Sequence, residues 1–94
     1  MFDWLIRRDK EGLTRRERNI IEAAQRRSPA VISVSAWRPG LLGIYVNDVL
    51  ADWEPGFLAA RSKALEVIDF LENRGFQVRA PGLRSEPSVR RADP

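Results

Sequence analysis

The sequence predicts a single α+β domain, a two-layer sandwich whose elements follow the order α-β-β-β-α-β. Three observations indicate this: a capped helical segment near residue 14, alternating apolar and polar residues over 30–37, and a long helical segment that ends at Gly75. Strand periodicity flanked by helical periodicity is typical of a sheet covered by helices. We expect an antiparallel three-stranded meander, a short fourth strand after the second helix, and one domain spanning residues 1–80.

The first helix begins at a capping box. Thr14 lies three residues before Glu17, so the Thr hydroxyl can accept from the Glu amide while the Glu carboxylate accepts from the Thr amide. The helix is expected to run to about Arg27, because Ser28 precedes Pro29 and the residue before proline avoids helical backbone angles. At helical spacing, one narrow apolar stripe contains Leu13, Ile20, Ile21 and Ala24.

Three strands are expected between the helices. Residues 30–37 alternate with period two and are rich in β-branched side chains, which predicts the first strand. Arg38-Pro39-Gly40 indicates a turn into a second strand over 42–46. Asn47 and Asp48 both tolerate positive φ and predict a two-residue hairpin turn into a third strand over 49–53. The alternative is one longer strand over 42–50.

The second helix is expected to have Pro55 in its first turn and Gly75 as a left-handed C-cap. Phe70 falls outside its apolar arc, and residues 76–80 are expected to form the short last strand. From Pro81 onward, Pro, Gly, Ser and charged residues predict a flexible tail over 81–94. The arc, which should pack on the sheet, contains Phe57, Ala60, Ala64, Val67, Ile68 and Leu71, widened by Leu58 and Leu65.

The composition argues against an enzyme. The chain has 94 residues with no Cys and no His, which excludes disulfides, Cys–His zinc sites and a histidine base. The one acidic cluster is Asp48, Asp52 and Glu54, which we expect to solvate a turn and to cap the second helix, whose N-terminal dipole favours anions. We expect no catalytic residue, cofactor or metal.

No apolar run is long enough for a signal peptide or a membrane span, so a cytoplasmic location is expected.

Surplus aromatic residues favour a function in protein binding. Trp4, Trp37, Tyr45 and Phe70 fall outside the predicted core, and aromatic side chains commonly anchor interfaces. If the first helix covers the sheet face that carries Trp37 and Tyr45, these two belong to the core instead. We predict an inhibitor or adaptor of a larger protein, a class common among small phage and mobile-element proteins that act on a host. An open sheet edge also allows a homodimer.

The alternative function is nucleic-acid binding through the first helix and the tail. The net charge is +3, and arginines concentrate towards both ends of the chain. Lys and Arg bind nucleic acid by displacing the counterions of phosphates. Glu17 and Glu22 interrupt the positive charge, however, and mixed-sign helix faces are usually only solvated. The residues predicted for this alternative are Arg7, Arg8, Arg15, Arg18 and Arg26.

Overall fold

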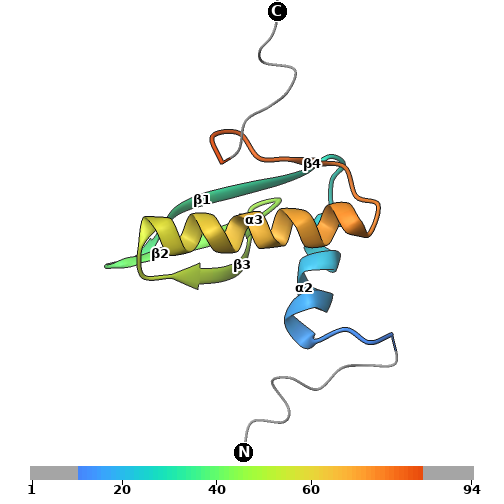
Figure 1. The fold of residues 1–94 in the computed structure, drawn as a ribbon, viewed down its shortest axis with the longest axis horizontal. Coiled ribbons are helices and arrows are strands. Elements are labelled where there is room, and N and C mark those ends of the chain that lie inside the picture. Colours follow the sequence, from blue (N-terminus) through green and yellow to red (C-terminus); the bar gives the residue numbers. More distant parts are fainter. Residues whose placement is uncertain (1–10, 84–94) are drawn as a thin grey trace, which may run out of the picture.

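A computed structural model describes residues 11–83 and confirms the predicted α+β order (Figure 1). The three-stranded meander and the short strand after the long helix are both present. The described elements are helix α2 (Arg15–Ala24), strands β1 (Ala30–Arg38), β2 (Leu41–Val46) and β3 (Val49–Glu54), helix α3 (Phe57–Asn73) and strand β4 (Val78–Arg79).

The four strands form one mixed sheet in the order β3-β2-β1-β4. β2 runs antiparallel to both β1 and β3, whereas β4 runs parallel to β1. α3 is the crossover between the two edge strands and lies across one face of the sheet, hereafter the inner face (Figure 1). α2 stands at one end of the sheet, near the C-terminal half of α3 (Figure 1).

The core lies between α3 and the inner face. Alternation along β1 directs Ile32 inward beside Val46, its partner on β2, and every second residue follows. The predicted apolar stripe is buried, and its members Ile20 and Ala24 join the same core, so α2 packs on the inner side together with α3. The largest fully buried side chains are Ile32, Ile44, Val46, Ile68 and Leu71.

The capping box at the start of α2 is confirmed. The Thr14 hydroxyl accepts from the Glu17 amide at 3.1 Å, and the Glu17 carboxylate accepts from the Thr14 amide at 3.0 Å. The end of the helix was predicted too late, because α2 stops at Ala24 rather than near Arg27. The carbonyl oxygens of Ala23 and Arg27 accept hydrogen bonds from a side chain that is distant in the sequence, and the helix does not continue past Ala24.

That side chain belongs to the hairpin turn between β2 and β3. Asn47 and Asp48 both have positive φ, 50° and 69°, as a two-residue turn that matches the twist of its strands requires. The predicted turn is therefore confirmed, and the alternative of one long strand is wrong. Asn47 is nevertheless only 5% exposed, which is unusual for a polar residue in a hairpin turn.

The buried Asn47 side chain joins three segments. Its amide nitrogen lies 3.0 Å from the Ala23 carbonyl oxygen, 3.4 Å from that of Ala24 and 3.2 Å from that of Arg27, so its two hydrogens are shared among three acceptors. Its carbonyl oxygen accepts from the Val31 amide at 2.9 Å, and its own backbone amide donates to the Val31 oxygen at 2.8 Å. One residue thus satisfies the C-terminus of α2 and fixes the start of β1 against the hairpin.

The two ends of α3 differ in how well they were predicted. At the C-terminus, Gly75 has φ 91°, its amide donates to the Glu72 oxygen at 3.0 Å, and the Phe76 amide donates to the Leu71 oxygen at 3.1 Å. This pair of bonds is a Schellman motif and confirms the predicted cap. At the N-terminus, Pro55 precedes the Gly56 N-cap and lies outside the helix, contrary to prediction.

Burial along the chain departs from prediction in two places. The first two residues of α3 are exposed, Phe57 at 57% and Leu58 at 79%, although both were assigned to the buried arc. Burial begins at Ala60, because helical periodicity gives a side chain its direction but does not supply a neighbour to cover it. At the other end, Leu83 is 5% exposed and packs in the core, three residues beyond the predicted domain boundary.

Replacement of Asn47 by Asp is expected to destabilise the domain by about 1–3 kcal/mol, because carbonyl groups of α2 lose their donor. Asp tolerates positive φ nearly as well as Asn, so the change isolates the hydrogen bonds from the backbone conformation. The measurement is the free energy of unfolding in urea. The control Asp48→Asn, at the exposed turn position, should stay within about 0.5 kcal/mol of wild type. Equal effects of the two variants would contradict the role assigned to Asn47.

Candidate protein-binding surface

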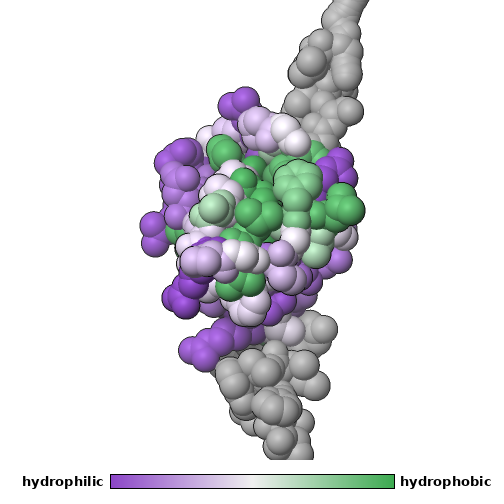
Figure 2. Space-filling model, turned by 90° about the vertical axis from the view of Figure 1, so that its left-hand side faces the viewer, coloured by the Kyte–Doolittle hydropathy of each residue, from purple (hydrophilic) through white to green (hydrophobic). Residues whose placement is uncertain are grey.

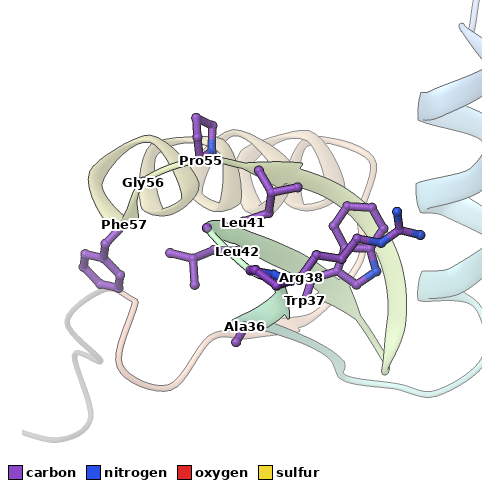
Figure 3. Close-up of a pocket in the computed structure, with 10 residues that line it drawn as sticks. Ala36, Trp37, Arg38, Leu41, Leu42, Pro55, Gly56 and Phe57 are labelled. Carbon is purple, nitrogen blue, oxygen red and sulfur yellow. The ribbon is translucent and has the colours of Figure 1, made fainter.

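An apolar groove lies where the β1–β2 turn meets the start of α3 (Figure 3). It is open to solvent and has a volume of about 520 Å³. One charged side chain, Arg38, lines it among otherwise apolar residues and glycines. The lining residues are Ala36, Trp37, Arg38, Pro39, Gly40, Leu41, Leu42, Pro55, Gly56 and Phe57.

A β-bulge shapes one wall of the groove. Ala36 pairs with Leu42 and Arg38 pairs with Leu41, so Trp37 between them has no partner on β2. An extra residue of this kind bends a strand and redirects the side chains beside it. Gly40, with φ 77°, then closes the turn that returns the chain as β2. The bulge and the turn carry Trp37 and Arg38 to one side of the groove, while Phe57 lies on the other (Figure 3).

Trp37 stacks on Trp53 at the outer face of the sheet. The ring centroids are 5.8 Å apart with an interplanar angle of 26°, and the Arg38 guanidinium lies 4.3 Å from the Trp37 ring centroid. Both stacking with an offset and a cation over an indole face are favourable. The tryptophans belong to β1 and β3, so their contact passes over β2 between them.

Gly43 of β2 lies between the strands that carry Trp37 and Trp53. A Cβ at Gly43 would meet Leu50 Cδ1 at 2.8 Å and Tyr45 Cε2 at 2.9 Å, so these two side chains fold over the glycine. No described helix covers this outer face, since α2 and α3 both pack on the inner one. Trp37 and Tyr45 are accordingly half-buried by their neighbours on the sheet rather than enclosed in the core.

Large apolar side chains are exposed at the groove end of the molecule. Within residues 11–83 they are Trp53, Phe57 and Leu58, exposed by 47%, 57% and 79%. They fall within six consecutive positions, at the end of β3 and the start of α3. Figure 2 shows the resulting apolar area on the end of the molecule that carries the groove. We call the groove and these three side chains the apolar end. Large exposed apolar side chains gathered at one end of a small domain commonly mark interaction sites.

The predicted partner-binding residues do not converge on one surface. Trp37 lines the groove and Tyr45 lies on the outer face, but Phe70 is on α3 at a separate hollow beside α2. Phe70 is half-buried, packs against the core and has the Arg74 guanidinium 5.6 Å from its ring centroid. Trp4 lies outside the described residues.

The arginines predicted to bind nucleic acid also differ in their surroundings. Arg15 and Arg26 are exposed, whereas Arg18 forms an ion pair with Glu11. Arg7 and Arg8 lie outside the described residues. Nucleic-acid binding through this helix stays a prediction.

The predicted role of the acidic cluster is wrong for Asp52. Gly56 caps α3 without a side-chain bond, and the first turn of α3 has no acidic residue. Asp52 instead faces α2: its side chain is 10% exposed, and its Oδ2 lies 3.0 Å from Arg16 Nη1. Its Oδ1 accepts from the Trp53 amide at 2.8 Å. This carboxylate ties β3 to α2, a contact between distant segments that the sequence did not predict.

Leu41, Leu42, Phe57 and Leu58 were not predicted to lie at a surface site. A signal was present, because each pair of adjacent apolar residues follows a Pro-Gly dipeptide at the start of an element. Adjacent residues point to different sides in a strand and to diverging directions in a helix, so both members of such a pair cannot be buried by one neighbour. At the start of α3, neither member is.

Neither α2 nor α3 combines the length and apolarity that a bilayer crossing requires. Over residues 11–83, no three Asp or Glu residues come close enough together to share a metal ion. No family model, curated protein or solved structure matches the chain.

A double-mutant cycle of Trp37→Ala and Trp53→Ala is expected to give a coupling energy of about 0.5–1.5 kcal/mol, the range for stacked aromatic pairs. Each single variant should keep the far-ultraviolet circular dichroism of the wild type, because both rings lie on the outer face. Urea unfolding of the four proteins supplies the energies. Strict additivity would show that the two rings do not contact each other in solution, and unfolding of either variant would place them in the core.

Proposed function

We propose that this chain is a non-catalytic protein-binding domain that inhibits or adapts a larger partner, and that it contacts the partner through the apolar end. The observation that carries the proposal is the exposure of Trp53, Phe57 and Leu58 beside the groove. Burial of apolar surface contributes about 25 cal/mol per Å². A partner that covers these side chains therefore gains free energy that the isolated domain leaves unused.

The surroundings of the groove favour a protein over a small molecule. Leu58 and Trp53 extend the apolar surface beyond the groove itself, so a ligand confined to the groove would leave them in water. Pro39 and Pro55 form part of the rim. Because proline restricts its own backbone, such a rim loses little conformational entropy on binding.

The same surface is a poor match for nucleic acid. Arg38 is the one charged residue that lines the groove, whereas binding to a phosphate backbone relies on several cations acting together. A single arginine among aromatic and aliphatic side chains resembles instead the composition of protein interfaces. Since the domain would act by occupying a surface of its partner, its effect should scale with its concentration rather than show turnover.

The test is site-specific photo-crosslinking of the full chain in cells that naturally express it. Leu58 is replaced by p-benzoylphenylalanine, and the matched control carries the same residue at Asp69, which is exposed on the same side of α3 about 16 Å further along the helix. We expect a covalent adduct with one other protein from position 58 and not from position 69. Adding Phe57→Ser should reduce that adduct about tenfold or more, the effect of losing an interface anchor.

Three results would contradict the proposal. Adducts of equal yield from positions 58 and 69 would indicate random encounters. The absence of any adduct at position 58 would indicate that the apolar end stays free. An adduct that nuclease removes would support the nucleic-acid alternative instead.

A further inference from the structure

β1 is paired along only part of one edge. It has nine residues, and β4 pairs with the first two of them, Ala30 and Val31. Within residues 11–83, no other strand pairs with this edge of β1. The edge therefore lies open towards the C-terminal end of the strand, the end that reaches the groove.

The direction of the backbone groups follows from three hydrogen bonds at the start of β1 and from the alternation of a strand. The Ala30 amide donates to the Gln77 oxygen, so Ala30 faces the β4 side, whereas Val31 exchanges bonds with Asn47 on the β2 side. Successive residues alternate between the two sides. Val34 and Ala36 consequently direct their amide and carbonyl groups to the open edge.

Two of the features that usually prevent strand addition are missing from this stretch. Edge strands are commonly protected by charged residues, proline or a covering segment. From Val34 to Trp37 there is neither a charge nor a proline, and both first appear at the following residues, Arg38 and Pro39. The open edge is thus chemically suited to pair with another extended chain.

The open edge runs directly into the groove. Ala36, Trp37 and Arg38 line the groove, and Leu42 extends into it from β2 towards Phe57 (Figure 3). Side chains of a strand added beside Ala36 would point alternately to the two faces of the sheet. Every second side chain would therefore lie on the inner side, where the one beside Ala36 would meet the groove. An apolar side chain is the match for that position.

Charge complementarity defines the rest of the occupant. Arg38 is exposed, is the one charged residue of the groove and forms no ion pair with an acidic residue of the described range, so a carboxylate on the bound segment would meet a cation beside it. A second copy of this chain, paired through its own β1, would bring another Arg38 and no acidic residue, because Arg38 is the sole charged residue of β1. The charge therefore favours a different protein over a homodimer at this edge.

We infer that the open edge of β1 binds an extended segment of a partner protein as an additional strand, with an apolar side chain in the groove and an Asp or Glu beside Arg38. This inference rests on the proposed function and specifies how the partner is held. Backbone hydrogen bonds to Val34 and Ala36 give the affinity, while the groove and Arg38 select the sequence.

The probe is a phage-displayed library of random dodecapeptides, selected on the purified full chain. We expect enriched peptides with apolar residues at alternate positions and an Asp or Glu near them. One enriched peptide is then synthesised with a single backbone N-methyl group at each position in turn. Strand addition predicts that N-methylation weakens binding about tenfold or more at every second position and has little effect at the positions between.

Charge reversal tests the position of Arg38. Arg38→Glu should weaken the same peptide about tenfold or more, and a peptide with Lys in place of its acidic residue should recover that loss. The matched control is Arg79→Glu, an exposed arginine on β4, which should leave affinity within about twofold of wild type.

The outcomes separate this inference from the proposed function. N-methyl effects without period two, or no rescue by charge reversal, would overturn strand addition while leaving protein binding at the apolar end intact. A selection that yields no peptide would also overturn it, whereas the proposed function is tested separately by the crosslinks from positions 58 and 69. A dimer in solution that Val34→Pro dissociates would assign the edge to a second copy and overturn the inference as well.

Discussion

The hydrogen bonds of the Asn47 side chain are the constraint on which this fold depends. A buried amide that lacks partners is costly, so the hairpin turn is stable in its place only when α2 and the start of β1 surround it. The same contacts end α2 at Ala24 and direct its apolar stripe towards α3. A small core with two helices of unequal length thereby acquires one arrangement, because the polar groups can be satisfied in only one way.

This constraint makes the two ends of the sheet chemically different. At the end that holds Asn47, backbone groups of three segments are satisfied and α2 and β4 cover the strands. At the opposite end, β1 extends beyond its pairing with β4, and Trp53, Phe57 and Leu58 are exposed at the end of β3 and the start of α3. Stability is supplied at one end, so the other can expose apolar surface and unpaired backbone without unfolding the domain. Binding at the exposed end is the function that this asymmetry supports.

Most of the fold could be predicted from local signals, and the site could not. The Thr14 capping box, the alternating apolar and polar residues of β1 and the Gly75 cap each act through neighbouring residues. Their effects could therefore be predicted from the sequence. Phe57 shows the limit: helical periodicity gave its direction correctly but could not show that no element packs against it. The pairing of Arg16 with Asp52 and the early departure of β4 from β1 likewise depend on segments far apart in the chain. The apolar end is exposed because no distant segment of the described chain covers it, and a missing long-range contact leaves no local pattern in the sequence.

Residue-resolved amide hydrogen exchange on the free protein tests the contrast between the two ends most directly. The account predicts that the Val31 and Asn47 amides exchange only through global unfolding, because both are bonded within the buried network. The Val34 and Ala36 amides of the same strand should exchange much faster, without any large opening. Uniform protection along β1 would contradict the open edge, and rapid exchange at Val31 and Asn47 would contradict the central role of the turn.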